Sequence, residues 1–440
     1  MNIIQITPGA GAMFCGGCFR DNALVAALRK LGHSTLMLPL YLPLTLDEEN
    51  QSEGTPIFFS GINVYLEQNS KFFRNAPQWL HRILASPKLL KLASKQAGKT
   101  NPRDLGELTV SMLRGEEGNQ ARELDDMVRW LVANEKPEII SLSNALLVSM
   151  ARRLKQELKA PVVCSLQGED YFLDLLPQPH RDLAWKILSE RTADVDLFIA
   201  PSKYFAELMG RRLGISANRI RVIYNGINLE GYDPTPDSKL KTQNPATLGY
   251  FARMCPEKGL EILVEAFVDL KKREMFKDLK LKVGGGCGPS DKPFVEKMRE
   301  RLRANHILAD VEFFPNLTRA EKQEFLRSLT VFSVPALYGE AFGLYVIEAL
   351  AAGVPVVQPR HSAFPELIEA TGGGLIFEPN PASLAETISQ LLANPKQLKL
   401  LGEQGRKSVQ ERFSVETMAK ETAKVFAEVA HDFGIANRNS

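Results

Sequence analysis

The stretch "NIIQITPGAGAMFCGGCFRDNALVAALRKLGHSTLMLPL", residues 2–40, indicates the fold class. A short β-rich run comes first. After a glycine-rich stretch, "RDNALVAALRKLGH" carries apolar residues at helical spacing up to Gly32. The segment "STLMLPL" then has the composition of a second strand. Strand, loop, helix and strand in this order predict a βαβ unit and therefore a parallel sheet.

The same alternation returns along the chain in two series. The first continues with "PEIISLSN", "APVVCSLQG" and "VDLFIAPS", and the second starts near residue 245 with "ATLGYFARM" and "LKLKVGGG". Between them lies "YNGINLEGYDPTPDSKLKTQNP", whose Asn/Gly turns and Pro/Asp/Ser/Lys content are typical of a linker. We therefore predict an α/β protein of two doubly wound, Rossmann-like domains, residues 1–238 and 239–413, that face each other across a cleft. Ligands of such sheets bind at the carboxyl ends of the strands.

Composition sets the class of protein. A chain of 440 residues is long enough for two domains with separate cores. Its formal net charge of +2 argues against a nucleic-acid binder. The first residues lack the basic region of a signal peptide, and no run has the roughly 18 uncharged apolar residues of a membrane span. Five cysteines do not suggest a secreted disulfide scaffold. These features predict a cytoplasmic globular protein.

The clearest chemical pattern is "YGEAFGLYVIEALAAGVPVV", residues 338–357. Glu340 follows a predicted strand, and Phe342, Gly343 and Leu344 open a predicted helix that reaches about Ala352. A helix start presents unpaired N–H groups and a positive dipole end to an anion, and a glycine there allows close approach to the backbone. Glu348 lies about 6 Å further along the helix axis. The plain alternative is an ordinary amphipathic helix with an acidic first turn.

A second pattern supports an anion site. In "GYFARMCPEKGLEILVEAF", Arg253 lies just after a predicted strand and Lys258 at the start of the next helix. Two cations at the carboxyl end of one strand can neutralise a diphosphate through charge-assisted hydrogen bonds. Because these two cations would supply the charge that Mg²⁺ supplies elsewhere, we expect neither a metal ion nor another cofactor, and no Asp-x-Asp metal motif contradicts this.

These segments, with "VIYNGINLEGYDP" and "PELI", resemble the retaining, nucleotide-sugar-dependent glycosyltransferases of family 4, which have the GT-B fold. The spacing of Glu340 and Glu348 matches the family's Glu-x7-Glu pattern. The resemblance is dense from about residue 190 to 385. It implies a C-terminal domain that binds a UDP-, ADP- or GDP-hexose and an N-terminal domain that binds a hydroxyl acceptor, either a glycan or a lipid-linked one. It also implies that a C-terminal helix, about residues 414–433, crosses back to the N-terminal domain.

The resemblance implies a role for each matching position. Arg253 and Lys258 would hold the donor diphosphate and stabilise the leaving group. Glu340 would bind hydroxyls of the donor sugar, and Glu348 would bind the ribose. Backbone amides at three further positions would contact the sugar and phosphate, namely Phe342, Gly343 and Leu344.

The acceptor side departs from the family. After "APVVCSL" many members carry a histidine near the reacting carbon, whereas this chain has Gln167. Glu169 in the same loop can orient an acceptor or take part in capping the next helix. On the glycine-rich stretch after the first strand, Gly16 and Gly17 would let backbone amides approach the diphosphate or the acceptor, and Arg20 would open the following helix with its neighbour Asp21.

The least typical region is a predicted helical insertion at about residues 65–125, which is similar to the extended N-terminal region of starch and glycogen synthases. Residues 69–103 hold eight Lys or Arg and no Asp or Glu, interleaved with aromatic residues. This composition suits a lid that packs on its domain, and it also suits weak peripheral contact with an anionic membrane surface.

Two other functions remain open from sequence alone. One keeps the GT-B scaffold but makes the protein a sugar epimerase or a phosphorylase. The other is a redox- or metal-sensing sugar-binding protein without catalysis, based on Cys15-x-x-Cys18. A zinc site takes four good ligands, often as two such pairs, and only one pair is present. Gly9-x-Gly11 is followed by Phe14 where a dinucleotide fingerprint needs its third glycine, which excludes that motif.

Overall fold

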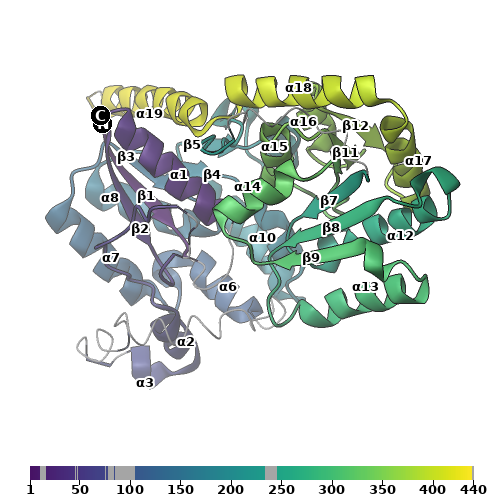
Figure 1. The fold of residues 1–440 in the computed structure, drawn as a ribbon. Coiled ribbons are helices and arrows are strands. Elements are labelled where there is room, and N and C mark those ends of the chain that lie inside the picture. The colour runs from purple at the N-terminus through teal and green to yellow at the C-terminus, as the bar shows by residue number, and fades with distance from the viewer. Residues whose placement is uncertain are drawn as a thin grey trace. The chain divides into compact units, whose positions relative to one another are not determined.

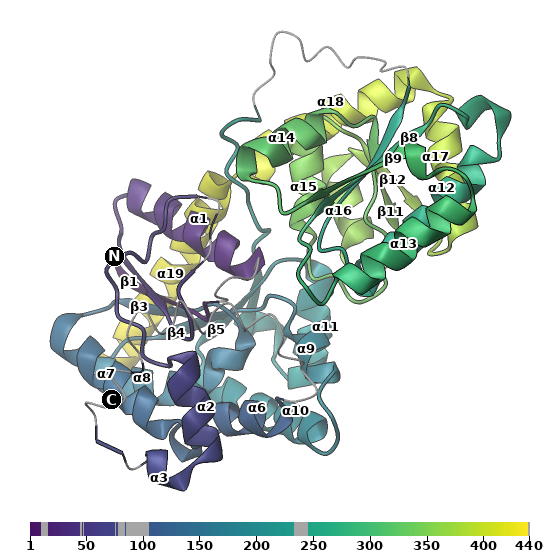
Figure 2. The same cartoon turned by 60° about the horizontal axis from the view of Figure 1, so that its bottom comes forward.

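The computed structural model describes residues 1–9, 16–44, 46, 48–74, 76–77, 84, 105–232 and 245–438. The chain divides into two compact units, Met1–Tyr224 with Met418–Ser440, and Asn225–Thr417 (Figures 1 and 2). The predicted domain boundary between residues 238 and 239 lies outside the described residues. Each unit is described below by itself.

The first unit is built on a parallel sheet in the order β2-β1-β3-β4-β5-β6. Its strands are β1 (Asn2–Thr7), β2 (Ser34–Pro39), β3 (Ile139–Leu142), β4 (Val162–Ser165), β5 (Leu197–Ala200) and β6 (Ile220–Val222). Every residue of β3, β4 and β5 is buried, as expected for strands that are covered by helices on both faces. The strand order reverses between β1 and β3.

The helices of the first unit follow the predicted alternation. They are α1 (Gly16–Lys30), α2 (Gly61–Asn69), α3 (Lys71–Arg74), α6 (Gly106–Leu113), α7 (Ala121–Asn134), α8 (Ala151–Leu158), α9 (Glu169–Asp174), α10 (His180–Arg191) and α11 (Lys203–Leu213). Much of the predicted insertion, residues 78–83 and 85–104, lies outside the description. None of the described helices is both long and apolar enough to cross a membrane.

The C-terminal helix α19 (Val415–Arg438) begins in the second unit and, from Met418 onward, belongs to the first. It lies next to α1 in both views (Figures 1 and 2). The hydroxyl of Ser414 accepts a hydrogen bond from the backbone N–H of Thr417 at 3.1 Å, which caps the helix start. The predicted return of this helix to the N-terminal domain is confirmed.

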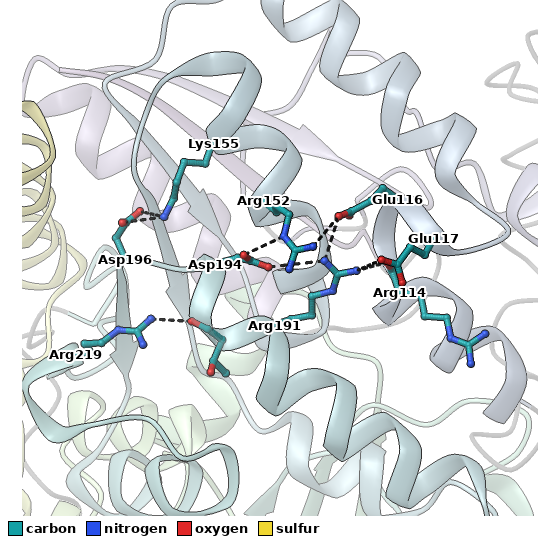
Figure 3. Close-up of polar contacts among 10 residues, drawn as sticks. Arg114, Glu116, Glu117, Arg152, Lys155, Arg191, Asp194, Asp196 and Arg219 are labelled. Atoms are coloured by element: carbon teal, nitrogen blue, oxygen red, sulfur yellow. Dashed lines mark hydrogen bonds and ion pairs between the residues drawn. The ribbon is translucent and has the colours of Figure 1, made fainter. Parts of the chain in front are cut away.

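A cluster of ion pairs and hydrogen bonds joins the end of α6 to α8 and α10 (Figure 3). Arg191 at the end of α10 is 7% exposed; it donates to Glu116 at 3.2 Å and to the carbonyl of Arg114 at 2.6 Å. Arg152 of α8 bridges Glu116 and Asp194 at 3.3 and 3.1 Å. A buried guanidinium with several acceptors holds these short elements in one arrangement.

Two carboxyl groups are buried where α2 packs near α7. Glu67 is fully buried, and Glu123 is 4% exposed and accepts a hydrogen bond from Asn63 at 2.9 Å. Burial raises the pKa of Glu67 to about 7 and, together with the charge of Glu67, raises that of Glu123 to about 8. Arg122 opposes both pKa shifts, Arg74 opposes that of Glu67, and Asp126 adds to both. Both carboxyl groups therefore bind a proton more readily in the folded state than in the unfolded chain.

This pair predicts a pH-dependent stability. A group whose pKa is raised by folding stabilises the fold below its unfolded pKa, and that contribution is lost as the pH rises through the folded value. We expect the free energy of unfolding of the first unit to fall by more than about 1 kcal/mol between pH 5 and pH 9. Glu123→Gln should remove much of this dependence, and Glu107→Gln, at an exposed position of α6, should not. Thermal melts across this range test it, and equal slopes in Glu123→Gln and wild type would contradict it.

The second unit contains a parallel sheet in the order β12-β11-β10-β7-β8-β9. Its strands are β7 (Thr247–Phe251), β8 (Lys280–Gly285), β9 (Val311–Pro315), β10 (Val331–Phe332), β11 (Val356–Pro359) and β12 (Gly374–Phe377). Its helices are α12 (Leu260–Lys271), α13 (Lys292–Ala304), α14 (Arg319–Arg327), α15 (Leu344–Ala351), α16 (Phe364–Thr371), α17 (Pro381–Leu392) and α18 (Pro395–Arg412). The order reverses between β7 and β10. Each unit is thus a doubly wound α/β layer structure, which confirms the predicted fold class.

Candidate functional site

The reversal between β7 and β10 is the natural ligand position of the second sheet. In open α/β sheets, ligands bind outside the carboxyl ends of the strands at the point where the order reverses. The segment after β7 carries Arg253 and Lys258, and the segment after β10 carries Glu340. The residues predicted from two separate sequence motifs therefore follow two adjacent strands.

The structure joins Lys258 directly to Glu340. The Lys258 ammonium donates to Oε2 of Glu340 at 2.6 Å, and the two side chains are 18% and 13% exposed. Burial alone would lower the pKa of Lys258, but the Glu340 carboxylate and the Tyr338 hydroxyl outweigh it and hold this pKa above its usual range. The ammonium also lies 4.8 Å from the ring centre of Tyr338. Lys258 therefore keeps its positive charge in a largely dry position.

A glycine makes this approach possible. Lys258 ends a short 3-10 turn, Pro256–Lys258, and Gly259 follows with φ of +72°. A Cβ on Gly259 would lie 1.7 Å from the carbonyl oxygen of Pro335, so any other residue would push the segment after β7 away from the segment after β10. The backbone N–H of Leu337 also donates to the carbonyl of Glu257 at 3.0 Å. Both segments are thus fixed before any ligand arrives.

Arg253 is held by an acidic residue that the sequence analysis missed. Its Nε and Nη2 donate to the carboxylate of Asp291 at 2.9–3.2 Å, and Gly288 donates a backbone N–H to the same carboxylate. The Asp291 side chain is 6% exposed and that of Arg253 is 59% exposed. Asp291 orients the guanidinium and raises the pKa of Arg253 further. Its position after β8, just before the start of α13, was the available signal.

The predicted helix start is present at Gly343. This residue has φ of +94° and precedes α15, which ends where predicted, beside Ala352. Phe342 is 3% exposed, and its ring packs 6.3 Å from that of Phe413, while Leu344 is half-buried. Because helix α15 lies directly after the segment that carries Glu340, its N-terminal amides belong to the same site.

Glu348 also has a lysine partner. Lys322 of α14 donates to Oε1 of Glu348 at 2.8 Å, and the side chains are 15% and 17% exposed. A capping box between Thr318 and Glu321 fixes the start of α14. Lys322 was not among the predicted site residues, because nothing in its local sequence pattern indicates that α14 faces α15. Each glutamate of the Glu-x7-Glu pattern is thus paired with a lysine from a distant part of the chain.

A tyrosine completes the contacts of Glu340. The hydroxyl of Tyr345, in the first turn of α15, donates to Oε2 of Glu340 at 2.8 Å. Burial, and then the charge of Glu340, raises the pKa of Tyr345 well above its usual range, so the phenol stays protonated. Tyr345 was not among the predicted site residues.

In the first unit, the glycine pair lies inside a helix. Gly16 and Gly17 are the first two residues of α1, whereas residues 10–15, including Cys15, lie outside the description. The prediction that Arg20 and Asp21 open this helix is wrong, because the helix starts four residues earlier. Glycine is a poor helix former, so the two glycines gave no local signal for this earlier start.

Arg20 and Asp21 instead form a buried ion pair within α1. Arg20 donates to Asp21 at 3.0 Å and to the hydroxyl of Ser165 at 3.3 Å, and Thr7 donates to Asp21 at 3.0 Å. Burial raises the pKa of Asp21, and Arg20 opposes this shift. The cluster ties α1 to the carboxyl ends of β1 and β4, which gives it a structural role.

The two predicted acceptor-side residues differ in their surroundings. Glu169 is 5% exposed and accepts the backbone N–H groups of Ala145 at 2.6 Å and Gln167 at 2.7 Å. It therefore ties the segment after β3 to the segment after β4. Gln167 is half-buried in the segment that Glu169 holds. Among the described residues, no group of three or more His, Cys, Asp or Glu is arranged to hold a metal ion.

Comparisons with known proteins agree with these features. Residues 110–230 match the model for Glycosyltransferase Family 4, and residues 233–408 match the model for Glycosyl transferases group 1. The chain is 30% identical over 254 residues to a D-inositol 3-phosphate glycosyltransferase of Streptomyces bingchenggensis, which covers 54% of each chain. It thus spans about half the length of this curated relative.

Solved structures show the same fold over nearly the whole chain. Sucrose-phosphate synthase from Thermosynechococcus elongatus matches with a TM-score of 0.69 at 18% identity, covering 98% of this chain and 99% of that chain. The Anabaena protein HepE, solved in complex with UDP-glucose, matches with a TM-score of 0.66 at 16% identity, covering 97% and 100%. The two family models together span more than half of the sequence and meet between the two series of strands. The chain therefore carries a Glycosyltransferase Family 4 domain followed by a Glycosyl transferases group 1 domain, and it has the GT-B fold.

Proposed function

We propose that this protein transfers a hexosyl unit from a nucleoside diphosphate sugar to a hydroxyl acceptor, with retention of the anomeric configuration and without a metal ion. The observation that carries the proposal is the Lys258–Glu340 pair at the strand-order reversal of the second sheet. It combines a cation suited to a diphosphate with a carboxylate suited to sugar hydroxyls. HepE, which shares the fold, was solved with UDP-glucose.

The side chains have complementary roles in this proposal. Lys258 and Arg253 bind the diphosphate and stabilise the charge that develops on it as the bond to the sugar breaks. Glu340 accepts hydrogen bonds from sugar hydroxyls, and Glu348 accepts them from the ribose. The N-terminal amides of α15, at Phe342, Gly343 and Leu344, contact the sugar and phosphate.

Retention requires that the new bond forms on the face that the leaving group vacates. The bond between the anomeric carbon and the diphosphate oxygen breaks, and the bond to the acceptor oxygen forms on the same face. The acceptor's hydroxyl proton passes to the departing phosphate oxygen, so that the products are the glycoside and a nucleoside diphosphate. Fixed cations stabilise this step without reorganisation, which is why we propose that no divalent ion is needed.

We propose that the first unit binds the acceptor, a glycan or a lipid-linked molecule, in the cytoplasm. Gln167 is the candidate contact, and Gly16 and Gly17 offer backbone N–H groups at the start of α1. Glu169 supports the segment that carries Gln167. The predicted contact of the basic segment 69–103 with an anionic membrane falls largely outside the described residues and stays a prediction.

A screen of UDP-, ADP- and GDP-hexoses for nucleotide release and for thermal stabilisation tests the proposal. We expect one donor to be hydrolysed slowly without an acceptor, to the same extent with and without EDTA, and NMR of the transfer product to show the donor's anomeric configuration. Loss of activity in EDTA would overturn metal independence alone. Binding of no nucleoside diphosphate and no nucleotide release would overturn the proposed function, and deuterium uptake at a sugar carbon would favour an epimerase.

Lys322 provides a separate prediction for the nucleotide end. Its ammonium holds one oxygen of Glu348, so Lys322→Met should leave that carboxylate less well oriented toward the ribose. We expect affinity for the nucleoside diphosphate to fall about 10-fold, in line with one charge-assisted hydrogen bond. Isothermal titration calorimetry measures this, with Lys420→Met, at an exposed site on α19, as the control. Equal affinities in Lys322→Met and wild type would exclude this role.

A further inference from the structure

One oxygen of Glu340 receives two donors. Oε2 accepts from the ammonium of Lys258 at 2.6 Å and from the hydroxyl of Tyr345 at 2.8 Å. The ring of Tyr345 packs against two aromatic rings. Its centre lies 6.4 Å from that of Phe332 and 6.5 Å from that of Phe364. The phenol is therefore a fixed donor, because its ring packs against two other aromatic rings.

The two donors differ in whether they can keep their hydrogen bond to Glu340 when a ligand binds. Lys258 has a flexible stem, and the proposed function requires it to contact the diphosphate. As it does so, Glu340 loses part of its charge partner while only 13% of its side chain is exposed. A buried carboxylate that loses a donor is costly unless another donor remains. The Tyr345 hydroxyl is that remaining donor, and it cannot turn away without disturbing the aromatic packing.

The other charged and titratable groups around this position do not replace it. Tyr338 faces Lys258, and burial, together with the Glu340 charge, raises the pKa of Tyr338 so that it stays neutral. Tyr250 lies near Tyr345, but its hydroxyl donates to the backbone carbonyl of Arg253 at 2.9 Å. Among the side-chain hydrogen bonds of the described residues, Glu340 accepts from Lys258 and Tyr345 alone.

We propose that Tyr345 is a positioning residue that keeps the Glu340 carboxylate in place while Lys258 contacts the donor diphosphate, and so leaves the second carboxylate oxygen for a hydroxyl of the donor sugar. This inference rests on the proposed function. It assigns Tyr345 to the sugar half of the donor, because its hydroxyl donates to Glu340, whereas Arg253 donates to Asp291 and Glu348 accepts from Lys322.

Tyr345→Phe tests the role because it removes one hydroxyl and keeps the packed ring. With the donor that the wild type uses, we expect kcat to fall about 10- to 100-fold, the range of one hydrogen bond to a charged group. Affinity for the free nucleoside diphosphate should stay within about 2-fold, because its proposed contacts are with Lys258, Arg253 and Glu348. A purely structural role would lower kcat and the affinity for the nucleoside diphosphate together, or leave both unchanged.

A double-mutant cycle with Glu340→Gln shows whether Tyr345 acts through Glu340. The measured quantity is the ratio of affinities for the nucleotide sugar and for the nucleoside diphosphate, from calorimetry on all four proteins. We expect each single variant to lower this ratio and the double variant to lower it no further. Tyr250→Phe, which also removes one buried phenolic hydrogen bond from the unit, should leave the ratio at its wild-type value.

The outcomes separate the two proposals. If the wild type transfers sugar but Tyr345→Phe keeps wild-type kcat, or if the two substitutions add independently, the role of Tyr345 is wrong and the proposed function stands. If the wild type binds no nucleoside diphosphate and releases none from any nucleotide sugar, the proposed function fails and this inference fails with it.

Discussion

Glu340→Gln is expected to lower the rate of sugar transfer about 100- to 1,000-fold, the range seen when one preorganised electrostatic contact is lost from an active site. The substitution keeps the size of the side chain and an oxygen that can accept from Lys258 and Tyr345. It removes the negative charge that balances Lys258 and the second carboxylate oxygen that we assign to a sugar hydroxyl. Nucleotide release and transfer assays with the wild-type donor measure the effect.

Two controls give this result its meaning. Glu369→Gln removes an exposed carboxylate from α16 in the same unit and should keep wild-type activity. The circular dichroism spectrum of Glu340→Gln should match that of the wild type, because the amide remains within the same hydrogen-bonding network. A Glu340→Gln protein that transfers sugar at a rate near the wild type would remove Glu340 from the proposed mechanism.

Lys258→Met is expected to abolish measurable transfer and also to destabilise the second unit. The first effect follows because the diphosphate loses its most buried cation, so affinity for the nucleoside diphosphate should fall at least about 100-fold, the equivalent of two charged hydrogen bonds. The second follows because Glu340 is left in a largely buried position without its counter-charge. Removing one partner of a buried ion pair costs about 3–5 kcal/mol.

The double variant Lys258→Met with Glu340→Gln separates these two effects. It removes both charges, so we expect much of the lost stability to return while transfer stays absent. Lys272→Met, at an exposed position after α12, serves as the matched lysine control and should change neither property. Chemical denaturation and calorimetry measure the two quantities. Unchanged nucleotide affinity in Lys258→Met would place the diphosphate elsewhere.

Much of the fold was predictable because its signals are local. Short apolar runs alternate with segments of helical periodicity, and glycines mark the helix ends at Gly32 and Gly353. These features depend on residues within a few positions of one another. The start of α1 was harder to predict, since Gly16 and Gly17 are poor helix formers that lie in a helix of this chain. Tertiary packing of the following buried residues outweighs that local preference.

The candidate site was predictable only in part, for the same reason. The spacing of Glu340 and Glu348, with the cations at Arg253 and Lys258, can be read directly from two motifs. Their partners cannot be read in this way. Lys258 and Glu340 are 82 positions apart in sequence, and Arg253 and Asp291 are 38 apart.

The sequence by itself determined the doubly wound class and the resemblance to family 4 glycosyltransferases, and it predicted the ligand-side residues of the second unit. Only the tertiary structure decided which groups hold those residues, namely Asp291, Lys322 and Tyr345. It also decided that Glu169 supports its segment through backbone hydrogen bonds. The physical reason is that strand order brings distant segments to one edge of a sheet, and hydrogen bonds and burial depend on that meeting rather than on neighbours along the chain.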